Sequence, residues 1–389
     1  MKILYLVSGL GPKAGWGTEY IQDLIISLSQ KGIQGWIINP IYGHTHPNWR
    51  RWTNKLEKNY NLKIISLIAP KWISRNFILH LALTPIFVTM EIVKLCRKEN
   101  FDIIHEFSST PIILCRHLIM KILFKVPTLF TLSVYNNTLL GNFRWFKIFN
   151  FANYYLIPSR EIINRLLNQG IRKDKIIFSP PGIDLSNFIN TQPKSNARKI
   201  LNIPSDKFVL TYFGSLTEEK GVTDLLKASL LINTKYINRL VIQLYVIWKG
   251  SLRHQTLIQE IKSGKYPLLN LIEKYTEIPT LLAASDSVIL PQQTGHGTTI
   301  PPISTIETIA SKKPLITTNI LGNRDFANFP NITIVPPKNP AKLAAAIVSS
   351  LKGKPWTKTS MDILRDYTIN NSTDKHLLIY KDILLQKIF

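Results

Sequence analysis

The sequence has 389 residues, 45% of them hydrophobic and 19% charged, which excludes a disordered chain and predicts a globular protein of two domains. Two cysteines, Cys96 and Cys115, exclude a disulfide framework and favour a reducing, cytoplasmic setting. The 48 basic residues against 24 acidic ones give a net charge of +24, which favours an anionic partner: phospholipid, a lipid-linked phosphate or nucleic acid. A solvated, lysine-rich surface is the alternative explanation of this charge.

The first half of the chain has the pattern of a βαβ unit. Residues 3–7 are a continuous apolar run, typical of a buried parallel strand, and a glycine-rich loop follows at 9–17. Apolar residues then recur at helical spacing over 21–28 and predict a helix. Further strands of the same sheet are predicted at 36–39, 101–104 and 128–132.

The most apolar stretch of this half is 77–93, but His80, Pro85 and Glu91 interrupt it. A membrane-spanning helix needs about 18 to 20 apolar residues in succession, so we expect a packed helix here. The first ten residues also lack the pattern of a signal peptide, because their short apolar run leads directly into the glycine-rich loop.

The same pattern starts again after a break at Pro180-Pro181-Gly182 and a linker at 193–195. A strand at 208–213, a loop at 214–221 and a helix at 222–232 repeat the architecture of the first half. Later elements are predicted as strands at 240–247, 287–290, 314–318 and 332–335, a helix after Asn339-Pro340, and an amphipathic helix at 376–385.

The residues Gly9, Gly11 and Ala14 fit the loose G-x-G-x-x-A pattern of a dinucleotide-binding loop. A nicotinamide enzyme also needs a carboxylate at the end of the second strand, where it binds the ribose hydroxyls. That strand ends in Ile38-Asn39-Pro40, so the pattern does not favour a dehydrogenase. The bare amides at 15–18 instead suit a phosphate or a sugar at the start of a helix, or simply a tight turn.

Six segments together resemble one family, and they are spread over nearly the whole chain. They are Gly15–Glu19, Asp102–His105, Ile176–Asp184, Gly214–Gly221, Ala284–Pro291 and Glu307–Pro314. Their order and spacing resemble family 4 of the retaining glycosyltransferases, in which a glycine loop, a "Lys-Gly" loop and a glutamate signature follow each other in this order. Each segment alone is a weak indication.

The resemblance implies an α/β protein of the GT-B fold, with two Rossmann-like domains that face each other across a cleft. We expect an acceptor-side domain at 1–182, a donor domain at 183–360, and a C-terminal helical segment at 361–389 that packs toward the first domain. The segment 180–184 would be the hinge on which the cleft closes.

The resemblance places the donor, a nucleotide sugar such as a UDP- or GDP-sugar, in the second domain. Departure of the nucleoside diphosphate builds negative charge, and Lys220 at the entry to a helix would stabilise it without an obligatory metal or cofactor. Glu307, near the start of a short helix, would accept hydrogen bonds from two ribose hydroxyls. The other expected donor-binding residues are Gly214, Ser215, Gly297, Thr298 and Thr299.

On the acceptor side, the resemblance implies a phosphate or acceptor loop at Gly15, Gly17 and Thr18, and catalytic roles for His105 and Ser133. A histidine at the end of a strand is as often a structural residue as a catalytic one.

Three positions depart from the family pattern. Thr299 stands where the family has its first glutamate, and Pro301-Pro302 follow where glycine amides are expected, although proline has no N–H to donate. Ser133 replaces the usual histidine and cannot carry a proton near neutral pH. Ser215 replaces an arginine, which removes one cation from the phosphate loop. A nucleotide-sugar-binding protein without catalytic activity is therefore an alternative to an active transferase.

The first half also mixes aromatic and basic residues at 49–52 and 143–147, with Arg116, Lys121 and Lys125 between them. Aromatic rings and cations of this kind are typical of a protein that rests on the headgroups of an anionic membrane. We therefore expect a cytoplasmic protein, peripheral to the inner face of a membrane, that acts on a sugar or lipid-linked acceptor. Nucleic acid is the alternative partner for the same charge, but no recognised binding motif supports it.

Overall fold

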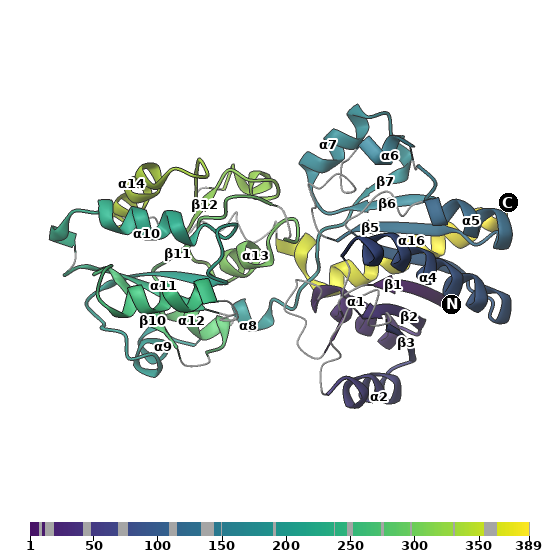
Figure 1. Cartoon of the computed structure of the whole chain (residues 1–389), viewed down its shortest axis with the longest axis horizontal. Helices are drawn as coiled ribbons and strands as arrows, with labels where there is room; N and C mark the ends of the chain where they lie inside the picture. The colour runs from purple at the N-terminus through teal and green to yellow at the C-terminus, as the bar shows by residue number, and fades with distance from the viewer. Residues whose placement is uncertain are drawn as a thin grey trace. The chain divides into compact units, whose positions relative to one another are not determined.

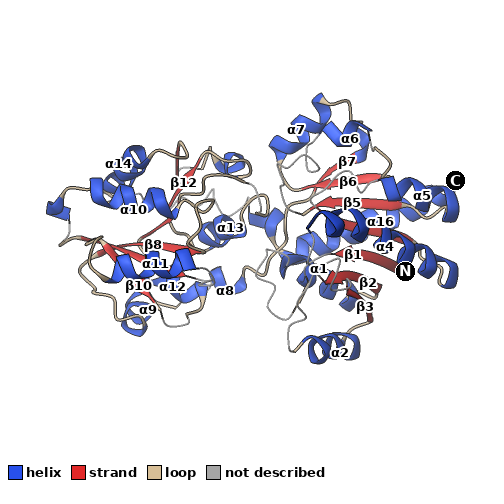
Figure 2. Cartoon of the chain, viewed as in Figure 1, coloured by secondary structure: helices blue, strands red, loops and turns tan. Residues whose placement is uncertain are grey.

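The apolar run that opens the chain forms the strand β1 (Lys2–Val7), which lies at the centre of a parallel sheet. The computed structural model describes residues 1–7, 10–11, 19–41, 48–68, 77–108, 115–133, 144–148, 150–189, 192–236, 238–246, 252–273, 276–295, 298–329, 331–353 and 364–388. Helices and strands alternate along the chain (Figures 1 and 2).

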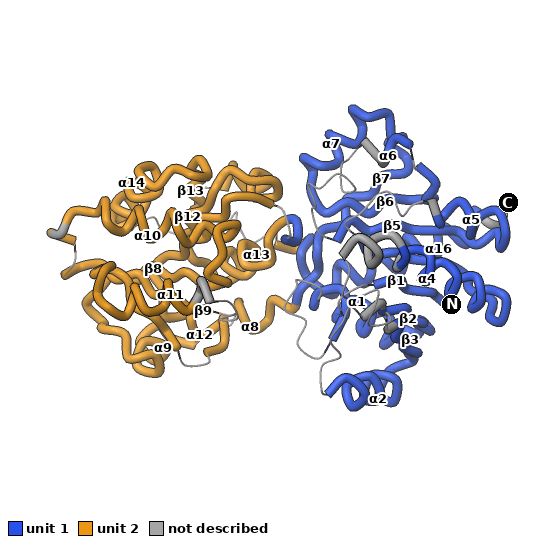
Figure 3. Tube along the Cα trace, in the orientation of Figure 1, with its two compact units in different colours: residues 1–183, 297–300, 366–389 blue, residues 184–296, 301–365 orange. Residues whose placement is uncertain are grey.

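The chain divides into two compact units (Figure 3). Unit 1 consists of Met1–Ile183, Gly297–Ile300 and Asp366–Phe389, and unit 2 of Asp184–His296 and Pro301–Arg365. Thr298 and Thr299 thus group with unit 1, although we expected them in the donor domain at 183–360.

Unit 1 contains a seven-stranded parallel sheet with the order β3-β2-β1-β4-β5-β6-β7. In the register of its centre, Leu4 lies opposite both Trp36 and Ile104. The other strands are β2 (Gln34–Ile41), β3 (Leu62–Ile68), β4 (Ile103–Ser108), β5 (Thr128–Leu132), β6 (Tyr154–Ile157) and β7 (Ile176–Phe178).

Helices cover both faces of this sheet because its strands are apolar on both sides. On one face, Val88 and Ile92 of α4 and Met120 of α5 pack on Leu4 and Ile104. On the opposite face, the C-terminal helix α16 packs beside α1 and covers β4. The helices of unit 1 are α1 (Glu19–Gln30), α2 (Trp49–Asn59), α4 (Phe77–Lys98), α5 (Cys115–Phe124), α6 (Arg144–Ile148), α7 (Arg160–Asn168) and α16 (Ile369–Ile388).

The chain crosses the start of α16 at Gly182. A Cβ atom at this position would lie 2.4 Å from the Cβ of Ser372 and 3.1 Å from the carbonyl oxygen of Thr368. The neighbouring Ile183 exchanges backbone hydrogen bonds with Tyr367 and Ile369. Close packing against α16 therefore explains the glycine of the Pro-Pro-Gly segment.

Unit 2 contains a six-stranded parallel sheet with the order β10-β9-β8-β11-β12-β13. Its strands are β8 (Phe208–Gly214), β9 (Leu240–Val246), β10 (Leu269–Ile272), β11 (Ser287–Leu290), β12 (Leu315–Thr318) and β13 (Ile332–Val335). Its helices are α8 (Ser186–Ile189), α9 (Lys194–Ile200), α10 (Val222–Leu231), α11 (Leu252–Lys262), α12 (Ile278–Ala284), α13 (Ile303–Ala310) and α14 (Pro340–Ser350). The strand order repeats that of unit 1, so both units are Rossmann-like.

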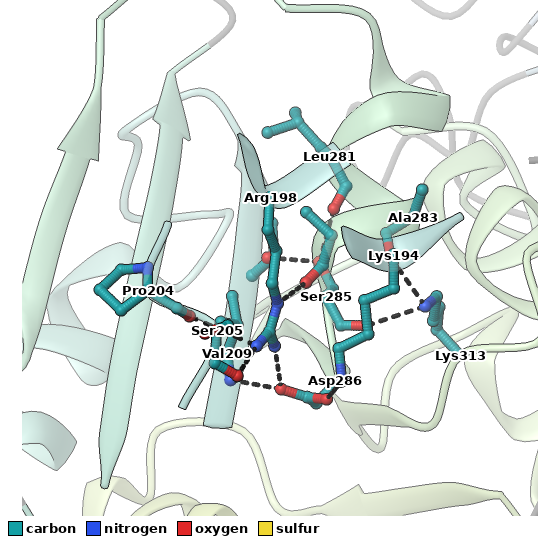
Figure 4. A network of polar contacts seen from close by, with 12 residues as sticks. Lys194, Arg198, Pro204, Ser205, Val209, Leu281, Ala283, Ser285, Asp286 and Lys313 are labelled. Atoms are coloured by element: carbon teal, nitrogen blue, oxygen red, sulfur yellow. Dashed lines mark hydrogen bonds and ion pairs between the residues drawn. The ribbon is translucent and has the colours of Figure 1, made fainter. Parts of the chain in front are cut away.

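A buried ion pair joins the amino ends of the strands of unit 2 (Figure 4). Arg198 is buried, donates to three backbone carbonyls, and pairs with Asp286 at 2.6 Å. Asp286 also accepts the backbone N–H of Val209 at 2.7 Å and pairs with Lys194. Burial and the nearby Lys194 lower the pKa of Lys313 to about 8, against the opposing attraction of Asp286. The network holds α9 against the sheet at the end away from the candidate site.

The structure corrects our expectation for the aromatic residues of unit 1. Trp49 is buried and its Nε1–H donates to Ser66 at 3.0 Å, and Phe146 is buried edge-on against Phe130 and Tyr155. These two rings fill the core and cannot face a membrane. The side chains of 143–145 lie outside the described residues. Among the residues described, no helix is both long and apolar enough to cross a bilayer.

Candidate functional site

The candidate site is the carboxyl edge of the sheet in unit 2, at the point where its strand order reverses. The strands β8 and β11 are neighbours there, with Val288 opposite Thr211. The chain continues from β8 to β9 on one side and from β11 to β12 on the other. In open α/β sheets, ligands bind beyond the carboxyl ends of the strands at such a point.

The loop after β8 begins at Gly214 and ends at Gly221, which precedes α10. Gly221 has a φ of +76° and its N–H donates to the carbonyl of Glu218 at 2.9 Å. A Cβ atom at Gly221 would lie 1.7 Å from the carbonyl oxygen of Pro291, which follows β11. Only glycine therefore allows the two loops of the reversal point to touch in this way.

Gln293 holds three loops of this edge together. Its side-chain amide donates to the carboxylate of Asp224 at 2.8 Å and to the carbonyl of Pro291 at 3.0 Å. Its side-chain oxygen Oε1 accepts the backbone N–H of Lys338 at 2.6 Å, and its backbone N–H donates to the backbone carbonyl of Glu219 at 2.8 Å. Our sequence reasoning missed this residue, although a Pro-Gln-Gln sequence directly after a buried strand could have indicated it.

Lys220 lies between Glu219 and Gly221 and is half-buried. Burial lowers the pKa of its ammonium, and the negative charge of Glu219 opposes that shift. No described residue forms an ion pair with Lys220. A desolvated ammonium next to a helix entry gains most when a phosphate replaces the lost water.

A buried polar network fixes the loop between β11 and α13. Asn323 donates to Thr317 at 2.8 Å and accepts from Thr305 of α13 at 3.1 Å. Thr317 in turn donates to the carbonyl of Leu290, and Thr318 donates to that of Gln292. Because buried polar groups are costly to leave without partners, this network fixes where α13 begins.

Glu307 is the fifth of eight residues in α13 and is half-buried. We expected it near the start of a short helix. Pro302 is the N-cap of α13, and the carbonyl of Glu307 accepts the N–H of Ser311 beyond the helix. The two residues before α13 are prolines, which have no N–H. The first N–H groups at the start of the helix are therefore those of Ile303 and Ser304. Glu307 thus lies in the second turn of α13.

The other expected donor-binding residues divide into two groups. Gly214 and Ser215 lie in the loop with Lys220, where the carbonyl of Ser215 accepts the hydroxyl of Tyr212 at 2.6 Å. Thr298 and Thr299 are buried and group with unit 1. Gly297 lies outside the described residues.

His105 of β4 is a structural residue, which corrects our expectation of a catalytic role. The residue is completely buried; its Nδ1 lies 2.7 Å from the hydroxyl of Tyr380, and its Nε2 2.7 Å from that of Thr131. Burial, and after it the neighbouring His376 and His117, lowers its pKa well below the usual value. Since α16 covers the ring and both nitrogens have partners, His105 cannot exchange a proton with a substrate.

Ser133 lies at the carboxyl end of β5 and is buried. Its N–H donates to the carbonyl of Ser108 at 3.1 Å, and its own carbonyl accepts the hydroxyl of Tyr20 at 3.4 Å. The loop that follows β1 is held from β2, where buried Asn39 donates to the carbonyl of Leu10 at 3.1 Å. The expected acceptor residues Gly15, Gly17 and Thr18 lie outside the described residues. In the part of the chain that the structure describes, no cluster of His, Cys, Asp and Glu could hold a metal.

Two family models match the chain one after the other. Residues 17–187 match the model described as Glycosyltransferase Family 4, and residues 207–352 match the model described as Glycosyl transferases group 1. The first match lies almost wholly in unit 1 and the second in unit 2.

A curated relative and several solved structures are similar to the chain. The O-antigen biosynthesis glycosyltransferase WclY of Escherichia coli is 25% identical over 240 residues, which are 57% of this chain and 62% of the relative. The match thus spans less than two thirds of the relative's length. A glycosyltransferase from Rickettsia africae ESF-5 covers 98% of both chains with a TM-score of 0.72 and 22% identity. Anabaena HepE in complex with UDP-glucose covers 98% of this chain and 100% of that chain, with a TM-score of 0.71 and 16% identity. Together with the two parallel sheets, these neighbours confirm the GT-B fold.

Proposed function

Because the chain belongs to the group 1 glycosyltransferases of family 4, we propose that it transfers a hexose from a nucleotide-sugar donor to an acceptor hydroxyl. The presence of UDP-glucose in the similar structure of HepE supports a UDP-sugar as the donor. The likeness to a transferase of O-antigen biosynthesis supports a growing glycan, carried on a lipid, as the acceptor.

The observation that carries this proposal is the position of Lys220 at the reversal point of unit 2. The donor diphosphate would lie against the loop 214–221, with its charge beside the half-buried ammonium. The contact between Gly221 and Pro291, and the hydrogen bonds of Gln293, hold this loop before the donor arrives. Because the loop that carries Lys220 is already held in position, no free energy is needed to rearrange it when negative charge develops on the diphosphate.

In the proposed reaction, the bond between the anomeric carbon and the diphosphate oxygen breaks, and its electron pair stays with the diphosphate. The acceptor oxygen forms the new bond to the anomeric carbon on the same face, so that the configuration is retained. In this proposal the hydroxyl proton passes to the departing diphosphate oxygen, and His105 takes no part because both of its ring nitrogens already have partners. Lys220 stabilises the diphosphate, and we expect the transfer to continue in the presence of EDTA.

The remaining expected residues have binding roles in this proposal. Glu307 of α13 accepts hydrogen bonds from the ribose hydroxyls, and Gly214 and Ser215 contact the diphosphate through the backbone. Thr298 and Thr299, together with Gly297, contact the sugar. On the acceptor side, Gly15, Gly17, Thr18 and Ser133 bind the hydroxyl-bearing substrate.

A second candidate function is the binding of a nucleotide sugar without transfer. Thr299 and the two prolines before α13 favour it, because they remove a carboxylate and two amides that a transferring site would use. In this case the donor would bind with the same dependence on Lys220 but would not be consumed.

A thermal-shift panel with UDP, GDP, ADP and a single-stranded oligonucleotide tests the donor site. We expect one nucleoside diphosphate to stabilise the protein by about 2.7 kcal/mol at a hundred times its dissociation constant. Lys220→Met removes a charged hydrogen-bond donor and should weaken binding by about 10- to 100-fold. The matched control is Lys227→Met, which changes an exposed lysine of α10 and should leave binding unchanged.

The corresponding pair for the ribose is Glu307→Gln, which should weaken binding of the nucleotide, and Glu277→Gln at the exposed start of α12, which should not. Equal binding by all four variants, or stabilisation by the oligonucleotide alone, would exclude the proposed donor site. Donor hydrolysis, measured as release of the diphosphate, then separates the transferase from the binding protein.

A further inference from the structure

The helices α4 and α5 of unit 1 (Figure 1) pack against each other. They leave an apolar surface exposed. Their inner faces contribute Val88, Ile92 and Met120 to the core. Their outer faces expose Ile86, Phe87 and Met90 on α4, and Leu118, Ile119, Ile122 and Leu123 on α5. Met90 is 62% exposed and Ile122 66%. A soluble monomer rarely leaves so many large apolar side chains in one place.

A groove of about 680 Å³ runs between the two helices. Its apolar lining comes from Pro85, Ile86, Met90, Val93 and Ile119. We call the outer faces of α4 and α5, together with this groove, the α4–α5 surface.

Basic side chains border the α4–α5 surface. Lys94, Arg97 and Lys98 occupy the last two turns of α4 and line the groove, and all three are exposed. Lys121 of α5 and Lys125 after it are also exposed. The acidic side chain of α4 among the described residues is Glu91, which pairs with Lys94 at 3.5 Å. The border of the surface is therefore strongly positive.

Arg116 also lines the groove but differs from these cations. Its side chain is buried and pairs with the buried carboxylate of Glu106 at 3.0 Å, and Glu106 also accepts from His117 at 3.0 Å. This charge is compensated within the core, so Arg116 fixes α5 on the sheet and does not count among the cations available to a partner.

Cations at the end of α4 are partly explained by the helix dipole, which favours positive charge there. The dipole does not explain the exposed apolar side chains one or two turns earlier on the same helix. An apolar centre with a cationic border matches the boundary between headgroups and acyl chains of an anionic membrane, where apolar residues insert and lysine and arginine contact phosphate.

We propose that the α4–α5 surface docks unit 1 on a membrane that contains anionic phospholipid. Ile86, Met90 and Ile122 enter the headgroup boundary, and Arg97 and Lys98 contact lipid phosphates. The α4–α5 surface supplies exposed apolar side chains that the expected segments 49–52 and 143–147 do not supply through Trp49 and Phe146, because these two rings belong to the core. The docking does not depend on the proposed transfer reaction, so it can fail or succeed independently of it.

Cosedimentation of the full chain with vesicles tests the proposal. We expect binding to phosphatidylcholine vesicles with about 30% phosphatidylglycerol and much weaker binding to phosphatidylcholine alone. The binding should weaken between about 0.1 and 0.5 M NaCl, because salt screens the attraction between cations and phosphates.

Two pairs of substitutions separate the apolar and basic contributions. Ile86→Ser with Ile122→Ser should lower the partition coefficient at least about tenfold, since both side chains lose their apolar insertion. Arg97→Gln with Lys98→Gln should lower it by about fivefold for each charge and reduce the salt dependence. All four residues are exposed, so the unfolding temperature should not change.

The control variants make the same chemical changes elsewhere. Lys55→Gln with Lys58→Gln removes two exposed charges from α2 of the same unit, and Leu230→Ser with Leu231→Ser removes two exposed apolar side chains from α10. Neither should alter vesicle binding. An equal loss in the controls would mean that net charge or general hydrophobicity accounts for the binding, and the proposal would fail.

Two other results would overturn the proposal. One is wild-type protein that does not bind the anionic vesicles. The other is a concentration-dependent dimer in light scattering that Ile86→Ser with Ile122→Ser dissociates while vesicle binding stays the same. That second result would make a second copy of this chain the partner of the α4–α5 surface.

Discussion

The substitution Gly221→Ala tests the contact that holds the two loops of the candidate site together. The added Cβ atom would lie 1.7 Å from the carbonyl oxygen of Pro291 and 2.5 Å from its carbonyl carbon. Real Cβ contacts are essentially never shorter than 3.0 Å, so the loops must separate by more than about 1 Å. Lys220, which precedes the substituted residue, would move with its loop.

The free-energy cost has two parts. An alanine at a φ of +76° costs about 1 to 2 kcal/mol, and relief of the clash with Pro291 costs about another 1 to 3 kcal/mol. A displacement of about 1 Å in a group that binds the reacting substrate reduces turnover about 100-fold. We therefore expect the unfolding free energy to fall by about 2 to 5 kcal/mol, and turnover of the donor per folded molecule to fall about 100-fold.

The matched control is Gly264→Ala in the same unit. Gly264 has a φ of +80°, but no atom lies within 4 Å of its added Cβ, so this variant has the cost of the backbone angle without the clash. Urea denaturation measures the stability of both variants, and release of the diphosphate from the nucleotide sugar measures their turnover. If Gly221→Ala matched Gly264→Ala in both measurements, the contact between the loops would not be what positions Lys220.

Three further predictions concern stability. Burial lowers the pKa of His376 to about 4 from the usual 6.5, so the unfolded chain accepts a proton before the folded one does. The contribution of neutral His376 to the unfolding free energy should be at its maximum above about pH 7, and the unfolding free energy should fall by up to about 3 kcal/mol toward pH 4. In urea titrations, His376→Gln should reduce this fall. Arg198→Met leaves the largely buried carboxylate of Asp286 without its buried partner and should lower the unfolding free energy by about 3 kcal/mol or more. Lys194→Met removes the exposed partner of the same carboxylate and should lower it by less than about 1 kcal/mol. Equal losses of stability in denaturation would contradict the assigned burial. Gln293→Leu should lower stability by about 2 kcal/mol and weaken nucleotide binding, and unchanged binding by calorimetry would show that Gln293 does not position the loops.

The strongly patterned elements of the fold are predictable from the sequence. Continuous apolar runs predict the central strands, and the expected strand 208–213 differs from β8 by one residue. Strands β3, β6, β7 and β10 are not predicted. Strands β11, β12 and β13 are as short as β6 and β10 and are predicted, so length alone does not decide, and pairing with neighbouring strands places the missed ones. The final helix begins seven residues before the expected 376–385, because its first turns pack on the Pro-Pro-Gly segment.

The candidate site is predictable only in part. The loop 214–221 and Glu307 can be found by their motifs, because glycine and a charged residue after a buried strand have a local signature. The burial of His105 has no local signature: Tyr380, which covers it, is 275 residues away in the chain. For the same reason, the sequence alone does not show that Trp49 and Phe146, which it suggests as membrane contacts, are buried in the core. The sequence of α4 likewise suggests an ordinary packed helix and does not reveal the apolar side chains that it exposes.

The turnover of a donor by the purified protein tests the central claim most directly. Incubation with UDP-glucose and other nucleotide sugars, followed by measurement of the released diphosphate, should show release from one donor, with Lys220→Met and Glu307→Gln slower and Lys227→Met unchanged. Release from no donor, with no nucleoside diphosphate bound either, would contradict a glycosyltransferase site at the carboxyl edge of unit 2.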